Sequence, residues 1–200
     1  MTLLVLLIAA CSTGRPTGAP VAPLTATTAD EASQQLQARR AGFRGMKSLM
    51  KIRSTSQGKT QSFRAQVAVH DTRRMDVIVY SPVGTTVMTM HIEGDLVKVK
   101  NLVENKEWEG GARDLPEPFR FLAASYGPAD IGMLIFGIPL PGGDRPNYGI
   151  QSEITPAGLR SAQIGMVTFV FSPPAFPAKS VVVTAGNDRV EIEHLEVVSE

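Results

Sequence analysis

The chain of 200 residues carries a formal net charge of +1 at neutral pH, which gives no field that would attract nucleic acid or a strongly acidic partner. Its 14 prolines and 18 glycines are typical of a turn-rich β protein and argue against a helical bundle. The only cysteine, Cys11, excludes an intramolecular disulfide, and the length fits one domain with a sizeable core.

An apolar run at residues 3–10 ends in two alanines directly before Cys11. The run is too short to cross a bilayer, which takes about 20 apolar residues, but it has the length of the core of a signal peptide. Residues 8–11 (Ile-Ala-Ala-Cys) match the lipobox, the motif whose cysteine is acylated and becomes the first residue of the mature protein. We therefore predict a signal peptide over 1–10 and a lipid on Cys11. The alternative is an ordinary buried strand with an incidental cysteine.

Two details around the predicted lipid bear on where the protein resides. No Lys or Arg precedes the apolar run, which would fit a translation start farther upstream. Ser12 stands where an inner-membrane retention signal has Asp, so the sequence favours the outer membrane, on its periplasmic face. Residues 11–29, rich in Thr, Ala, Pro and Gly, have the composition of a tether. The folded domain is thus expected to cover residues 30–200.

The folded part is predicted to open with a helix over 31–40 that has Asp30 as its N-cap. Runs of alternating or β-branched residues separated by turn signals then predict two series of strands. The expected strands are 46–55, 62–70, 75–80, 86–92, 96–99 and 102–108, followed by 148–154, 159–164, 166–171, 179–184 and 189–198. Short polar turns between neighbours indicate an antiparallel meander, so we predict a mainly β (α+β) fold with a strongly curved sheet that forms an incomplete barrel.

The middle of the chain predicts two short helices, over 116–126 and 131–136. Asp130 is the expected cap of the second helix, and Gly137 its end. That second helix is apolar nearly all round, so it needs cover on both sides. It would either pack as plain core or lie over an apolar cavity.

The sequence contains no recognisable catalytic arrangement. His70, His91 and His194 have no metal-ligand spacing, and each is expected on the surface of a strand. No serine sits in a G-x-S-x-G elbow. We therefore predict a protein that is not an enzyme and that needs no cofactor or metal beyond the covalent lipid.

The segment Ser81-Pro-Val-Gly has the preferred residues of a type I turn, with Pro82 at its second position. This turn would place Val83 at the tip of a connection between strands. Either Val83 folds back onto a neighbouring strand, or it is an exposed apolar finger that touches lipid or a partner that carries lipid.

Residues 80–87 (Tyr-Ser-Pro-Val-Gly-Thr-Thr-Val), 134–142 (Leu-Ile-Phe-Gly-Ile-Pro-Leu-Pro-Gly) and 177–179 (Pro-Ala-Lys) resemble, in the same order, the LolB family of outer-membrane lipoproteins. The resemblance implies an unclosed antiparallel barrel with helices as a lid over an apolar cavity. It implies that a monomer accepts the acyl chains of lipoproteins from a LolA-like periplasmic carrier and inserts them into outer-membrane lipid. In the family a leucine projects from the turn that matches residues 81–84 and is needed for insertion; here Val83 takes its place.

A cavity of this kind requires apolar side chains that adapt to a flexible ligand, as methionine does. The predicted cavity and lid residues are Met88, Met90, Ile131, Met133, Leu134, Ile135 and Phe136. Two other functions stay open: a structural or assembly lipoprotein that holds an envelope protein partner, and a carrier of another lipid.

Overall fold

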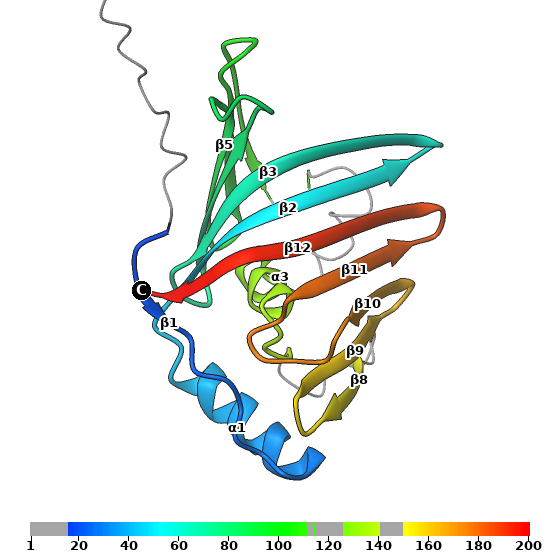
Figure 1. The fold of residues 1–200 in the computed structure, drawn as a ribbon. Coiled ribbons are helices and arrows are strands. Elements are labelled where there is room, and N and C mark those ends of the chain that lie inside the picture. The colour runs from blue at the N-terminus through cyan, green and yellow to red at the C-terminus, as the bar shows by residue number, and fades with distance from the viewer. Residues whose placement is uncertain (1–15, 112–113, 115–125, 141–149) are drawn as a thin grey trace, which may run out of the picture.

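The computed structural model describes residues 16–111, 114, 126–140 and 150–200 (Figure 1). The predicted signal peptide, Cys11 and residues 116–125 of the predicted helix over 116–126 lie outside these residues.

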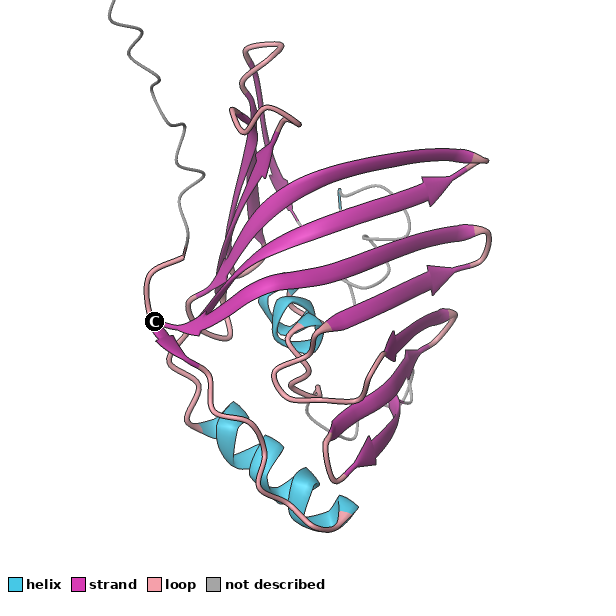
Figure 2. Ribbon diagram, viewed as in Figure 1, coloured by secondary structure: helices cyan, strands magenta, loops and turns pink. Residues whose placement is uncertain are grey.

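A single antiparallel sheet dominates the molecule and bends into an open, curved shape (Figure 2). Its strand order is β7-β6-β5-β4-β3-β2-β12-β11-β10-β9-β8, and β1 pairs with β12 beside this path. The strands are β1 (Ala19–Pro20), β2 (Met46–Ser56), β3 (Lys59–Val69), β4 (Arg74–Tyr80), β5 (Thr86–Glu93), β6 (Leu96–Asn101), β7 (Lys106–Gly111), β8 (Ile150–Thr155), β9 (Gly158–Ile164), β10 (Val167–Phe171), β11 (Ser180–Ala185) and β12 (Asp188–Ser199). The predicted fold class, a mainly β protein with a strongly curved antiparallel sheet, is confirmed.

The strand predicted over 102–108 is wrong at its start, because residues 102–105 form the turn that precedes β7. The side-chain oxygen of Asn101 accepts hydrogen bonds from the backbone N–H groups of Val103 (3.0 Å) and Glu104 (3.1 Å). Asn105 adopts a positive φ of 50°, which turns the chain back. These local bonds hold the turn where an apolar pair, Leu102 and Val103, suggested a strand.

Helix α1 (Ala29–Ala41) begins earlier than predicted. Its N-cap is Thr28, whose hydroxyl accepts from the backbone N–H of Glu31 at 3.2 Å, and Asp30 lies in the first turn instead of capping it. Ala32 and Leu36 are the buried residues of the helix.

The segment expected to be a tether is in contact with the domain from residue 19 on. Ala19 and Pro20 pair with Ser199 and Val198 of β12. Val21 and Leu24 pack against the main core.

Helix α3 (Pro128–Ile135) lies on the inner face of the curved sheet, where it contacts β3 and β4 (Figure 1). It begins three residues earlier than predicted, with Gly127 as its N-cap, and Asp130 makes no capping bond. The close approach to the sheet depends on Gly132, because a Cβ there would lie 2.7 Å from both Met75 Sδ and Val69 Cγ2. None of the helices in the described ranges is long and apolar enough to cross a membrane.

The main core fills the part of the sheet from β3 through β2 and β12 to β8. There α3 and the chain after it meet large buried side chains of the inner face, among them Leu159, Phe169, Phe171 and Val181. In the remaining part, β4 to β7, Met75 and Val77 of β4 pack against the main core, and Ile92 and Val97 form a small separate core. The two halves of the barrel are therefore filled to different degrees, and this difference positions the candidate site.

Candidate lipid-binding face

One row of apolar side chains crosses the inner face of the less filled half. Val77 pairs with Met90, Met90 with Val99, and Val99 with Trp108, so the four side chains lie side by side on neighbouring strands. The first three are half-buried, and Trp108 is exposed. Methionine and β-branched side chains that remain partly exposed on the concave side of a sheet form a surface on which an acyl chain could be buried.

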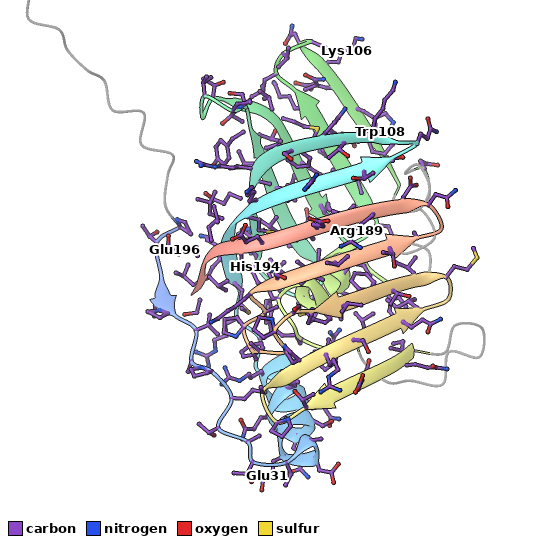
Figure 3. All side chains as sticks on the ribbon, turned by 45° about the vertical axis from the view of Figure 1, so that its right-hand side comes forward. Glu31, Lys106, Trp108, Arg189, His194 and Glu196 are labelled. Carbon is purple, nitrogen blue, oxygen red and sulfur yellow. The ribbon has the colours of Figure 1, made fainter. Side chains whose placement is uncertain are left out.

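Trp108 lies flat along β7 because Gly110, two residues further on the same face, has no side chain. A Cβ at Gly110 would lie 2.5 Å from Cζ2 of the indole ring. Trp108 is 40% exposed at the outermost strand of this half (Figure 3). It thus forms the rim of the apolar row.

The row is closed at the end that approaches α3. Ile92 and Val97 are buried there, and Met75 packs against them and against the main core. Met88 lies on the same inner face as Met90, two residues nearer to the β4–β5 turn, and it is half-buried. The two predicted strand methionines are therefore brought together on the open part of the face.

The predicted lid residues of α3 and the residue after it divide into two groups. Met133, Leu134 and Phe136 are fully buried members of the main core. Ile131 and Ile135 are partly exposed and pack at its edge. The first group packs within the protein, and only the second group lies where a ligand could touch it without the helix moving.

His194 ties α3 to the sheet, and the expectation that it lies on the surface is wrong. Its side chain lies between β12 and the end of α3, where Nε2 is 3.1 Å from the carbonyl oxygen of Ile135, and its ring centroid is 5.4 Å from that of Phe136. Burial lowers the pKa of His194 to about 4, against the weaker opposing effect of the bond to Ile135. The imidazole is therefore neutral at physiological pH. In the sequence, His194 continues the alternating pattern of Val190 and Ile192, whose side chains lie on the inner face. This pattern could have indicated that His194 faces inward.

A second connection joins α3 to α1. The guanidinium of Arg40 donates from Nη2 to the carboxylate of Asp130 and from Nη1 to the carbonyl oxygen of Pro139 at 3.2 Å. Both ionic side chains are largely buried. Arg40 therefore clamps the start of α3 and the segment after it, and its role was not predicted from the sequence.

A groove of about 590 Å³ lies over β4–β7, and the four residues of the apolar row, Val77, Met90, Val99 and Trp108, line it. Their neighbours along the four strands complete the lining: Asp76, Ile78, Thr89, His91, Lys98, Lys100, Glu107 and Glu109. The charges pair across the strands, Lys98 with Glu109 at 3.2 Å and Lys100 with Glu107 at 2.6 Å. The lining of the groove therefore includes both the apolar row and paired charges.

A polar network surrounds the other two histidines, His70 and His91. Asp76 bonds to His91 Nδ1 at 2.6 Å and to His70 Nε2 at 2.7 Å, and His70 Nδ1 lies 2.7 Å from Glu200. Burial raises the pKa of Asp76, but the hydrogen bonds from His91 and His70 outweigh it and leave that pKa below its ordinary value. No group of three or more His, Cys, Asp and Glu in the described part of the chain has the arrangement of a metal site.

Val83 stands at the tip of the β4–β5 connection, as one of the two sequence interpretations expected. The N–H of Gly84 donates to the carbonyl oxygen of Ser81 at 2.9 Å and closes the predicted four-residue turn. Val83 is 78% exposed and does not fold back onto a strand. Pro82 is exposed beside it.

No family model matches the chain, and no curated protein matches it in sequence. Solved structures match its fold over nearly the whole chain. A LolA superfamily protein from Nitrosomonas europaea aligns with a TM-score of 0.50 at 8% identity, over 88% of this chain and 94% of that one. The chain has a LolA-like fold. A candidate outer membrane lipoprotein-sorting protein domain from Vibrio parahaemolyticus gives 0.55 at 9% identity, over 85% and 91% of the two chains. A DUF1329 family protein from Desulfovibrio piger gives 0.53 at 10% identity, over 87% and 94%.

Proposed function

We propose that this LolA-like chain is an outer-membrane lipoprotein that accepts the acyl chains of other lipoproteins from a LolA-like periplasmic carrier. It passes them to the outer membrane without a catalytic step. The observation that carries the proposal is the half-exposed apolar row formed by Val77, Met90 and Val99 on the inner face of β4–β6. One protein of the same fold is described as a lipoprotein-sorting domain, which supports this class of cargo.

The physical requirement for such a role is apolar surface and not chemistry. Exposing an acyl chain of about 16 carbons to water costs roughly 12 kcal/mol, at about 0.8 kcal/mol for each CH₂ group. An open half-barrel with a methionine-containing inner face can bury part of that chain, and release to a bilayer then needs only a site of higher affinity. No bond has to be made or broken.

The LolB-like form of the proposal rests on three further features. The segments at 80–87, 134–142 and 177–179 resemble that family in order. Val83 is exposed at the turn where the family has its inserting leucine. The lipobox ending at Cys11 supplies an acylated attachment to the outer membrane. Two or more acyl chains on that cysteine would make the attachment stable.

Substitution of two adjacent residues on β5 tests the acyl-binding face. Met90 lies in the apolar row, whereas the side chain of Thr89 points to the other face of the same strand. Met90→Glu is expected to weaken binding of a fluorescent fatty acid and of an acylated peptide at least tenfold, because it places a carboxylate against the acyl chain. Thr89→Glu adds the same charge on the other face and should bind as the unchanged chain does.

Transfer is measured with an acylated lipoprotein that has been preloaded on a LolA-like carrier. The unchanged chain is expected to take the cargo and release it to phosphatidylcholine vesicles. A chain that binds neither fatty acid nor acylated peptide contradicts the proposal. Binding of free fatty acid without uptake of the lipoprotein would instead indicate a carrier of another lipid.

A further inference from the structure

Two neighbouring hairpins place exposed apolar residues at the same end of the sheet. The β4–β5 turn carries Val83, which is 78% exposed, and the β6–β7 turn carries Val103, which is 74% exposed, beside Leu102. Because adjacent strands run antiparallel, the turn after β4 and the turn after β6 lie at one end. They are joined directly, since the N–H of Leu102 donates to the carbonyl oxygen of Val87 at 2.9 Å.

Both turns hold these side chains in fixed positions. Ser81 and Thr85 share a hydrogen bond between their hydroxyls at 2.7 Å, and the Thr85 N–H donates to the Ser81 hydroxyl at 3.2 Å. In the second turn the side chain of Asn101 accepts from two backbone N–H groups. Little conformational freedom remains to be lost when the tips meet a partner.

We propose that Val83, Leu102 and Val103 together form a surface that dips into a lipid bilayer, and this inference rests on the proposed function for the identity of that membrane. The proposed surface includes the β6–β7 hairpin in addition to Val83, the one tip that the sequence predicts. Three side chains of this size offer roughly 300 Å² of apolar area, below the approximately 800 Å² per partner that a stable protein interface buries. A bilayer sets no such threshold, because the strength of membrane binding scales with the apolar area that the surface buries.

The charges around the two tips favour apolar insertion over electrostatic adsorption. Lys106, at the end of the β6–β7 hairpin in Figure 3, pairs with Glu104 at 2.9 Å, and Lys100 pairs with Glu107 at 2.6 Å. These pairs leave the neighbourhood close to neutral. Binding is therefore expected to be the same on zwitterionic and on anionic lipid, and to be insensitive to salt.

The lipid anchor and the tips can reach one membrane. Strand β1 enters the sheet at the end opposite the tips, where Ala19 pairs with Ser199. The eight residues from Cys11 to Ala19 span at most about 29 Å, and the seven residues of β4 cover roughly 23 Å. A fully extended segment of that length is thus longer than β4, the strand that leads from this end of the sheet to the β4–β5 turn.

Met166, the most exposed large apolar side chain at 84%, provides a matched control. It lies at the β9–β10 turn, on the other half of the sheet. This turn is at the same end of the strands as Val83 and Val103, but the curvature of the sheet directs it to the right in Figure 1, whereas the turns of β4–β7 project to the top. A bilayer that contacts Val83 and Val103 is expected to leave Met166 in water, although the side chain of Met166 is as exposed as those of the two valines.

The test uses the full chain with Cys11→Ser, so that a single introduced cysteine takes the label. A nitrobenzoxadiazole group is attached at Val83→Cys, Val103→Cys or Met166→Cys, and its fluorescence is read on phosphatidylcholine vesicles with and without brominated acyl chains. Labels at 83 and 103 are expected to brighten at least twofold and to be quenched by the bromine. The label at 166 should show neither change.

A second measurement avoids the label. Leu102→Ser combined with Val103→Ser is expected to lower the vesicle partition coefficient roughly tenfold or more, whereas Met166→Ser leaves it unchanged. Thermal unfolding of the variants should match that of the unchanged chain, because the substituted side chains project into solvent.

Each other outcome overturns the inference. A label at 103 that stays in water while the label at 83 inserts removes the second hairpin from the surface. Equal insertion at 166, or binding that requires anionic lipid, indicates non-specific adsorption. The Met90→Glu binding experiment is read separately, so failure of the tips and failure of the acyl-binding face are distinguishable.

Discussion

The hydroxyl of Ser48 on β2 lies 2.9 Å from Nδ1 of His194 on β12. The carbonyl oxygen of Ile135 can only accept, so the proton of the neutral imidazole is on Nε2, and Nδ1 accepts from Ser48. Ser48 is fully buried. One imidazole therefore links two strands of the sheet to the last residue of α3, and its burial there disfavours the charged form.

His194 makes the stability of the fold depend on pH. Its pKa is about 4 in the folded chain, below the 6.5 of an exposed histidine, so between these values the unfolded chain binds a proton that the folded chain does not. The contribution is fully present above pH 6.5. It is lost at up to about 1.4 kcal/mol per pH unit as pH falls to about 4, roughly 3 kcal/mol in all.

Urea unfolding at pH 7.5, 5.5 and 4.5 measures this contribution of His194 to the unfolding free energy. His194→Gln should flatten the slope, and His91→Gln should keep it; an unchanged slope in His194→Gln would contradict the assignment.

Arg40→Gln is expected to loosen α3. The substitution leaves the largely buried carboxylate of Asp130 without its cation and removes a donor from the Pro139 carbonyl. We expect a loss of about 1–3 kcal/mol in unfolding free energy and faster amide exchange over residues 128–135. The exposed Arg44 gives the control, since Arg44→Gln should change stability by less than about 0.5 kcal/mol. Unchanged exchange in α3 would show that the pair does not hold the helix.

Gly132→Ala should destabilise the protein, although alanine is the better helix former by about 1 kcal/mol. The new Cβ would lie 2.7 Å from Met75 Sδ and from Val69 Cγ2, so the helix or these side chains must move, at about 1–3 kcal/mol. Combining it with Met75→Ala removes one of the two clashes. The double variant should therefore lose less than the sum of the single variants in urea unfolding. A stabilising Gly132→Ala would mean that the contact is not tight.

Most of the sheet could be predicted because its strands obey local rules. Alternation and turn signals such as Gln57-Gly58 and Gly186-Asn187 mark the hairpins, and these depend on neighbouring residues alone. The predictions are wrong where a contact with another part of the chain determines the local structure. Pairing of Ala19–Pro20 with β12 depends on the far end of the chain. Thr28 caps α1 with a bond that Asp30 was equally suited to make by composition.

The candidate site could be predicted only in outline. Met88 and Met90 lie together on the inner face because the period of a strand fixes which face they occupy. Burial of Met133 and Leu134 depends on how α3 meets the sheet, which the apolar pattern of the helix leaves open. The clamp between Arg40 and Asp130 joins residues 90 apart in the sequence, and no local signal marks it.

With β1 left aside, the described strands pair with strands that are consecutive in the sequence. The one exception is the seam where β12 meets β2. Residues 46–111 and 150–199 therefore each form a ladder of local hairpins, which can assemble early because little chain has to be closed into loops. The register from Met46–Ser199 to Thr55–Arg189 then unites them. Until it forms, two long strands offer open edges to other chains, so a cell that makes this protein must protect that seam from aggregation.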